Sequence, residues 1–319
     1  MSELATAIRG GDRKALARGI TLVESRRADD ALQAEALLQA LLPHTGGAAR
    51  VGITGAPGVG KSTLIEAIGL DLCAAGHRVA VLAVDPSSAL SGGSILGDKT
   101  RMHELARHDN AFIRPSPGGD TLGGVAARTR EALLLCEAAG HDVVLVETIG
   151  TGQSEVAVAG MVDFFLLLLS PAAGDELQGI KRGVMELADG VLVHKADGDL
   201  AAAADRAAQQ CMLAMRVLHS GTTPPPVLVG SSLTKRGLGE LWQAIGARLQ
   251  QARADGSFAA RRARQIGDWL EHAVRERLLA EFLDDPVVGA AMARARDEVV
   301  RGAILPSAAA RALLALRRH

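Results

Sequence analysis

Short apolar runs alternate with longer segments of helical spacing between residues about 48 and 254. The short runs are strand candidates: Val51–Thr54, Val79–Asp85, Ala111–Pro115, Val143–Glu147, Phe164–Leu169, Gly190–His194 and Val227–Gly230. Strands that alternate with helices in this way form βαβ units, in which parallel strands are covered by helices on both faces. The pattern therefore predicts an α/β domain built around a mostly parallel central sheet flanked by helices.

Helical patterns without strands lie on both sides of this region. Leu16, Ile20 and Val23 recur at helical spacing near the start, and that pattern ends at Pro43. We predict an N-terminal helical extension over residues 1–47, the α/β domain over 48–254, and a C-terminal helical arm over 255–319. The arm either caps the sheet or forms a dimer contact, because a helix without enough local core usually packs on something else.

The composition excludes some classes of partner. Hydrophobic residues make up 48% of the 319 residues, but aromatic residues only 2%, and tyrosine is absent. Such a core is built from Ala, Val, Leu and Ile, as in a parallel sheet. Single-stranded nucleic acid needs aromatic stacking platforms, and a formal net charge of -1 provides no general basic field for a phosphate backbone. We predict no nucleic-acid partner.

The cysteines and the apolar runs indicate a cytoplasmic protein. Cys73, Cys136 and Cys211 are odd in number and far apart, so no disulfide framework is expected. The N-terminus has no apolar run that could serve as a signal peptide. The most apolar stretch, Phe164–Leu169, is too short to span a bilayer. We therefore predict a cytoplasmic location without a membrane partner.

A glycine-rich segment joins the first strand candidate to a helical run. Lys61 can neutralise the charge of the β- and γ-phosphates, and the Ser62 hydroxyl can bind Mg²⁺. The glycines let backbone N–H groups surround phosphates, and the helix N-terminus adds a favourable dipole. The segment predicts a P-loop NTPase fold, because it matches G-x-x-x-x-G-K-[ST] in the required strand–helix context. The predicted nucleotide-binding residues are Gly55, Ala56, Pro57, Gly58, Val59, Gly60, Lys61, Ser62 and Thr63.

Two strand candidates end in an acid. Asp85 ends one of them and Glu147 ends another. A Mg²⁺–triphosphate needs carboxylates at the carboxyl ends of strands that neighbour the P-loop. An acid after a strand also often caps the next helix, but two such acids in a chain with a P-loop favour a role in positioning metal or water.

Three glycine-hinged loops are candidate switches. They cover residues 91–101, 150–155 and 174–181, and the last two contain Gln153 and Lys181. Glycine hinges and polar tips are what an order–disorder switch needs. The segment 174–181 could equally be a helix N-terminus whose acids suit the dipole, so both interpretations stay open.

The segment 190–197 resembles the guanine-reading N-K-x-D element of GTPases, with His194, Lys195 and Asp197. A carboxylate at Asp197 can accept hydrogen bonds from N1–H and the 2-amino group of guanine together, and adenine lacks this pair of donors. His194 stands where asparagine is usual. It can donate one hydrogen bond but cannot reproduce both functions of an amide.

A serine loop follows the last strand candidate. Ser231, Ser232 and Leu233 can close over the base with backbone N–H groups, in the order that GTPases use. The predicted ligands are therefore GTP or GDP with Mg²⁺. We expect the preference for GTP to be kept and the affinity to be altered by His194.

Together these motifs resemble the MeaB/ArgK-like GTPases, the chaperones associated with methylmalonyl-CoA mutase, within the SIMIBI class of P-loop proteins. The likeness covers nearly the whole chain. It is carried by the segments Gly11–Arg18, Ile20–Ser25, Gly52–Thr63, Val84–Ser88, Ser91–Met102, Glu147–Glu155 and Gly174–Lys181.

The resemblance implies a homodimeric, cytoplasmic GTPase that guards an adenosylcobalamin-dependent acyl-CoA mutase and gates loading of its cofactor. It implies that Asp85, Asp98 and Glu147 serve the magnesium and switch regions, and that residues 174–181 communicate with the mutase. The departure from the family pattern is His194. Because of it, the client is either methylmalonyl-CoA mutase or a sister enzyme for another branched or hydroxylated acyl-CoA.

For hydrolysis, we expect Lys61, Ser62 and Mg²⁺ to hold the γ-phosphate while Glu147 or Gln153 orients the attacking water. No arginine finger can be read from the sequence, so slow basal turnover is expected. Lys181 or Arg101 is then a candidate cation that moves in when the partner binds.

Three rival functions are open to test. A P-loop kinase would transfer phosphate to a small molecule or protein, although the sequence has no acceptor-binding signature. A nickel-delivery GTPase should carry a His/Cys cluster, whereas the nine histidines here are scattered. A scaffold would bind nucleotide without hydrolysing it.

Overall fold

The computed structural model describes residues 3–25, 27–84, 102–115, 122–148, 154–171, 182–221 and 223–316. The chain divides into two compact units, Met1–Gln265 and Ile266–His319. The first unit holds the sheet together with the N-terminal helices. The second is purely helical over its described part.

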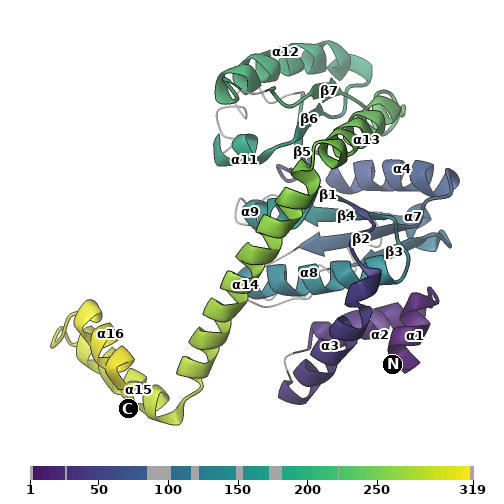
Figure 1. The fold of residues 1–319 in the computed structure, drawn as a ribbon. Helices are drawn as coiled ribbons and strands as arrows, with labels where there is room; N and C mark the ends of the chain where they lie inside the picture. Colours follow the sequence, from purple (N-terminus) through teal and green to yellow (C-terminus); the bar gives the residue numbers. More distant parts are fainter. Residues whose placement is uncertain are drawn as a thin grey trace. The chain divides into compact units, whose positions relative to one another are not determined.

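A seven-stranded sheet forms the centre of the first unit (Figure 1). Its spatial order is β3-β2-β4-β1-β5-β6-β7, and each neighbouring pair is parallel. The sequence prediction of seven strands in an α/β fold is confirmed. The strands are β1 (Ala49–Gly55), β2 (Val79–Val84), β3 (Ala111–Arg114), β4 (Val143–Thr148), β5 (Phe164–Leu169), β6 (Gly190–Val193) and β7 (Val227–Val229).

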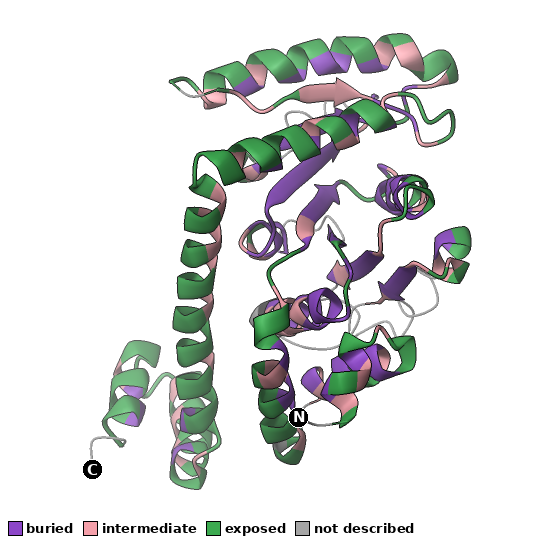
Figure 2. Cartoon of the chain, turned by 45° about the vertical axis from the view of Figure 1, so that its right-hand side comes forward, coloured by how far each residue is buried: buried purple, intermediate pink, exposed green. Residues whose placement is uncertain are grey.

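Helices cover both faces of the sheet (Figure 1). Alternate strand residues point to opposite faces, and both sets are apolar, so each face packs against helices. Val143 and Leu145 of β4 pack with α4 (Lys61–Ala74), α7 (His103–Arg107) and α13 (Leu238–Ala254). Val144 and Val146 pack on the other face with α2 (Arg13–Val23), α3 (Ala28–Leu41), α8 (Leu122–Ala138) and α9 (Glu155–Ala159). A third cluster joins β5 and β6 to α11 (Arg182–Leu187) and α12 (Ala201–Leu218). Strands β1 to β6 are largely buried, whereas the edge strand β7 is only partly buried, as Figure 2 shows. Burial on both faces accounts for the near-continuous apolar sequences of β1 to β6.

The described helices of the first unit include short and long elements. They are α1 (Glu3–Arg9), α2 (Arg13–Val23), α3 (Ala28–Leu41), α4 (Lys61–Ala74), α7 (His103–Arg107), α8 (Leu122–Ala138), α9 (Glu155–Ala159), α11 (Arg182–Leu187), α12 (Ala201–Leu218) and α13 (Leu238–Ala254), with 3₁₀ turns at Leu42–His44 and Gly198–Leu200. Asp12 begins α2, because its side chain accepts hydrogen bonds from the backbone of Lys14 and Ala15.

Helix α14 (Ser257–Leu283) begins in the first unit, where ion pairs tie its first turns to the amino ends of two strands. Arg262 Nη2 lies 2.7 Å from Asp163 Oδ2, one residue before β5. Arg261 Nη2 lies 2.8 Å from Asp189 Oδ2, one residue before β6. These contacts explain why the first unit extends to Gln265, beyond the end of α13.

The second unit contains the rest of α14 with α15 (Pro286–Val300) and α16 (Pro306–Ala315). Its small core is formed by Phe282, Val288 and Leu313. Among the helices that the structure describes, none is both long enough and apolar enough to cross a membrane.

Candidate functional site

The glycine-rich segment lies between the carboxyl end of β1 and the start of α4. We call residues 55–63 the phosphate cradle. Gly60 begins α4 in the left-handed conformation, with φ +102°. A Cβ atom at Gly60 would also lie 2.6 Å from Nδ1 of His194. Both the backbone angle and the neighbouring ring therefore require glycine, and the chain here can place its N–H groups close to a bound anion.

Lys61 is buried within the phosphate cradle. Its Nζ donates hydrogen bonds to the carbonyl oxygens of Gly55 at 2.8 Å and Ala56 at 3.1 Å. The ammonium group thus lies inside the curve of the loop. A bound phosphate would meet this cation together with the first N–H groups of α4.

Ser62 and Glu147 connect the first turn of α4 to the carboxyl end of β4. The Ser62 hydroxyl donates a hydrogen bond of 2.9 Å to Glu147 Oε1, and both side chains are buried. β1 and β4 are neighbours in the sheet, and Thr148 donates across them to Thr54 at 2.8 Å. A hydroxyl and a carboxylate are the hard oxygen ligands that Mg²⁺ prefers, so this pair fits a magnesium–phosphate site.

The loop after β6 faces the cradle from the other side. His194 Nδ1 lies 2.9 Å from the carbonyl oxygen of Val59, and Nε2 lies 2.6 Å from Ser232 Oγ. Burial lowers the pKa of His194 below its ordinary value, which favours the neutral ring. Because a carbonyl oxygen only accepts, Nδ1 carries the proton and Nε2 accepts from the Ser232 hydroxyl. Lys195 Nζ donates to the carbonyl oxygen of Gly58 at 2.7 Å.

The loop after β7 closes against the same segment. We call residues 231–237 the base loop. The Ser231 hydroxyl donates to Asp197 Oδ2, and the same hydroxyl oxygen accepts from the backbone N–H of Thr234 at 3.3 Å. Ser231 is fully buried, whereas the Leu233 side chain is largely exposed. Asp197 is thereby held beside the cradle by a buried partner.

The structure thus gathers the predicted phosphate residues, Glu147, His194, Lys195, Asp197 and the serine loop at one edge of the sheet. Five other candidate residues lie outside the described residues: Asp85, Asp98, Arg101, Gln153 and Lys181. Within the described part of the chain, no group of three or more His, Cys, Asp or Glu residues is arranged to hold a metal ion.

Two supporting contacts had no signal in the sequence motifs. Lys235 of the base loop lies 2.5 Å from Asp71 of α4, and Thr54 pairs with Thr148. Both join residues that are far apart in the chain and carry no motif of their own. Only the neighbouring strand order, once known, would have indicated the threonine pair.

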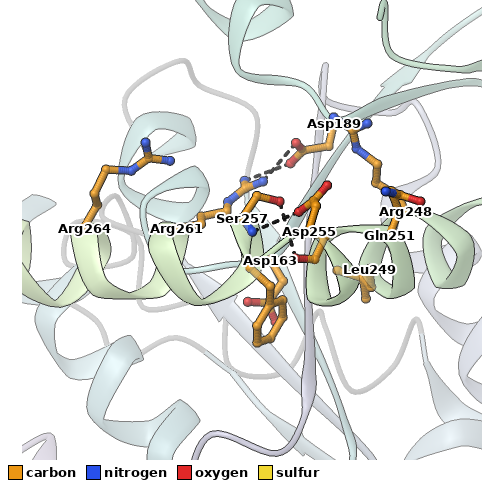
Figure 3. Close-up of a pocket in the computed structure, with 11 residues that line it drawn as sticks. Asp163, Asp189, Arg248, Leu249, Gln251, Asp255, Ser257, Arg261 and Arg264 are labelled. Carbon is orange, nitrogen blue, oxygen red and sulfur yellow. Dashed lines mark hydrogen bonds and ion pairs between the residues drawn. The ribbon is translucent and has the colours of Figure 1, made fainter.

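A separate pocket of about 230 Å³ lies at the opposite, amino-terminal edge of β5 and β6 (Figure 3). Its lining includes Asp163, Asp189, Arg248, Phe258 and Arg261. The Arg261–Asp189 ion pair occupies one side of it. Acidic and basic side chains are mixed in this lining, and the strand ends that carry the phosphate cradle lie at the other edge.

Several known proteins are similar to this chain over most of its length. The family model of the methylmalonyl-CoA mutase-associated GTPase MeaB matches residues 16–286. A protein of Caulobacter vibrioides named a GTPase is 56% identical over 308 residues, covering 96% of this chain and 94% of that protein. GTPase ArgK of Escherichia coli is 47% identical, with 88% and 85% covered. The mouse methylmalonic aciduria type A homolog, a mitochondrial protein, is 45% identical, with 98% and 79% covered.

A solved structure has the same fold over nearly the whole chain. The crystal structure of LAO/AO transport system kinase superposes with a TM-score of 0.76 at 36% sequence identity. The likeness covers 99% of this chain and 97% of that one.

Proposed function

The chain belongs to the MeaB family of methylmalonyl-CoA mutase-associated GTPases. We propose that it couples GTP hydrolysis to the maintenance of an active adenosylcobalamin-dependent acyl-CoA mutase. In this role it would gate loading of the cofactor and protect or reactivate the mutase. The observation that carries the nucleotide half of the proposal is the Ser62–Glu147 hydrogen bond at the start of α4. It joins a P-loop hydroxyl to an acid at the end of the neighbouring strand.

The proposed hydrolysis depends on positioning and on neutralising charge. Lys61 and the N–H groups of the cradle bind the terminal phosphates. Mg²⁺, when bound, would neutralise phosphate charge, with Ser62, Glu147, Asp85 and Asp98 as its proposed ligands. Glu147 or Gln153 orients the attacking water, and Lys181 is the proposed mobile cation.

Guanine selectivity is assigned to Asp197. Its carboxylate is held in place by the Ser231 hydroxyl, and the base loop is tied to the same segment through Ser232. A carboxylate accepts from the two donors on the N1 and 2-amino edge of guanine. Adenine presents an acceptor at N1, so its binding would leave the carboxylate without a donor.

A homodimer is the proposed assembly. The part of α14 in the second unit exposes four apolar residues at intervals of one helical turn: Ile266, Leu270, Val274 and Leu278. Such a stripe suits packing against a second helix. The proposed location is the cytoplasm, which is consistent with the three free, buried cysteines.

The chaperone role is tested by retention of purified candidate mutases on the immobilised chain, with GDP or a non-hydrolysable GTP analogue. Methylmalonyl-CoA mutase or a sister mutase should be retained, in an amount that depends on the nucleotide. Lys61→Ala is the control that should lose this dependence. If no mutase is retained although the chain binds GTP, the chaperone role is wrong and the GTPase remains.

The alternative function is that of a kinase, because the similar protein of known structure is named a transport system kinase. GTP labelled in its γ-phosphate separates the two. A GTPase releases the label as inorganic phosphate, whereas a kinase leaves it on a protein or small molecule.

A further inference from the structure

The ring of His194 connects two loops that bind different halves of a nucleotide. One nitrogen contacts Val59 in the phosphate cradle and the other contacts Ser232 in the base loop, at 2.9 and 2.6 Å. Only 2% of the residue is exposed to solvent. The ring also fills the space beside Gly60, so that no residue with a side chain fits at position 60.

Both hydrogen-bonding groups of the neutral ring are therefore used within the protein. Nδ1–H donates to the carbonyl oxygen of Val59, and Nε2 accepts from the Ser232 hydroxyl. Lowering of the His194 pKa by burial favours this neutral form. No ring nitrogen is left to contact a base.

We infer that His194 is a positioning residue that links the phosphate cradle to the base loop, so that closure over the base and binding of the phosphates reinforce each other. The inference rests on the proposed GTP site. It assigns to the ring a bridging role rather than base recognition, and it leaves Asp197 as the side chain that selects guanine.

The chemistry of the side chains allows the two halves of the bridge to be separated. The amide nitrogen of asparagine occupies the position of Nδ1, so His194→Asn can keep the bond to Val59. Asparagine has no atom at the position of Nε2, so the same variant loses the bond to Ser232. Ser232→Ala removes that bond from the other side. Ser232→Ala should therefore have no further effect once His194 is replaced by asparagine.

The experiment is a double-mutant cycle on GDP and GTP affinity, measured by calorimetry in excess Mg²⁺. With His194 in place, Ser232→Ala should weaken both affinities by about fivefold, as expected for one net hydrogen bond. In His194→Asn, the further change Ser232→Ala should alter the affinities by less than about twofold, because the bond is already absent. Ser220→Ala, at an exposed serine of another loop, is the matched control and should bind as the wild type does.

A spectroscopic measurement on the nucleotide-free wild type tests the bridge independently of binding. With ¹⁵N-labelled histidine, the His194 ring should show its proton on Nδ1 at neutral pH, whereas histidine in water favours Nε2–H. A proton on Nε2 overturns the inference, as do additive effects in the cycle. If the wild type binds no guanine nucleotide at all, the proposed function fails, and the tautomer alone then decides on the bridge.

Discussion

The hydroxyl of Ser62 donates a 2.9 Å hydrogen bond to Glu147 Oε1 and so joins the first turn of α4 to the end of β4. The two residues are 85 positions apart in the chain. They meet because β1 and β4 are neighbours in the sheet, with Ile53 in register with Glu147. This arrangement places a carboxylate beside the phosphate cradle, so the role of its negative charge can be tested by substitution.

Replacing Glu147 by glutamine keeps a side chain that can accept the Ser62 hydrogen bond and removes the negative charge. We expect GDP affinity to change little and the rate of GTP hydrolysis to fall by about 100-fold, since metal and water positioning depend on that charge. Steady-state phosphate release over a Mg²⁺ titration measures the rate of hydrolysis, and calorimetry measures the GDP affinity. Glu240→Gln, at an exposed acid of α13, is the control. Unchanged hydrolysis in Glu147→Gln would remove this residue from the mechanism.

Replacing Gly60 by alanine tests the shape of the cradle. The substitution meets both a backbone angle of +102° and the His194 ring, whereas Gly76, with φ +93°, has open space around it. Gly76→Ala should cost about 1 kcal/mol of unfolding free energy from its backbone angle alone and leave GDP affinity intact. Gly60→Ala should cost more and weaken GDP binding by at least about tenfold. Equal binding by the two variants would contradict the assigned cradle geometry.

The anchor of α14 predicts a large effect on stability. Arg262 donates to Asp163 and to the carbonyl oxygens of Gly46 and Ala48, and Asp163 is nearly inaccessible to solvent. Arg262→Ala leaves that buried carboxylate without its cation, so we expect a loss of about 3 kcal/mol in the free energy of unfolding. Chemical denaturation measures it. Arg182→Ala breaks only an exposed pair within α11 and should cost less than about 0.5 kcal/mol.

If the two arginine variants had the same stability, the buried network would have no role in holding the first turns of α14. A smaller loss for Arg262→Ala would indicate that water reaches Asp163 when the guanidinium group is removed.

The pH dependence of stability depends on two shifted groups of opposite sign. Burial raises the pKa of Glu131 from 4.5 to about 7, opposed by the charge of Arg128. The folded chain then holds a proton that the unfolded chain loses, so stability falls as pH rises from 4.5 to about 7. Burial lowers the pKa of His141 from 6.5 to about 4. There the unfolded chain holds the extra proton, and stability rises with pH from about 4 to 6.5.

The two contributions oppose each other where their windows overlap, and Glu131→Gln removes the first. We expect this variant to equal the wild type at pH 4 and to exceed it by about 2 kcal/mol at pH 8. Thermal unfolding at a series of pH values makes the comparison. Glu186→Gln, at an exposed acid of α11, should follow the wild type throughout. A stability gain that did not depend on pH would point to packing rather than to protonation of Glu131.

The sequence was sufficient for features that depend on local pattern. Strands β1 to β6 were predictable because they are largely buried on both faces and read as apolar runs. The edge strand β7 is only partly buried, and its apolar residues after a proline turn were its only signal. The phosphate cradle was predictable because its glycines and Lys61 are contiguous in the chain. Asp197 and the serine loop could be assigned to one site from their order along the chain.

Contacts between distant residues could not be predicted in the same way. His194 and Val59 are 135 positions apart, and the partner is a backbone oxygen that leaves no trace in the sequence. Arg262 and Asp163 carry no motif, so the helical pattern after α13 gave no sign that its first turns are tied to the sheet. The structure adds the His194 contact to a site whose residues the sequence had predicted, and it adds a separate attachment of α14 to the sheet.

Selection of guanine by Asp197 at a Mg²⁺-dependent triphosphate site can be tested by a calorimetric comparison of GTP, ATP and xanthosine triphosphate. The wild type should bind GTP at least about 100-fold more tightly than ATP, because adenine offers no donor pair to the carboxylate. Asp197→Asn should reverse the order of GTP and xanthosine triphosphate, since an amide N–H donates to the 2-oxo group of xanthine. Equal affinity of the wild type for GTP and ATP, or an unchanged order in Asp197→Asn, would show that Asp197 does not select the base.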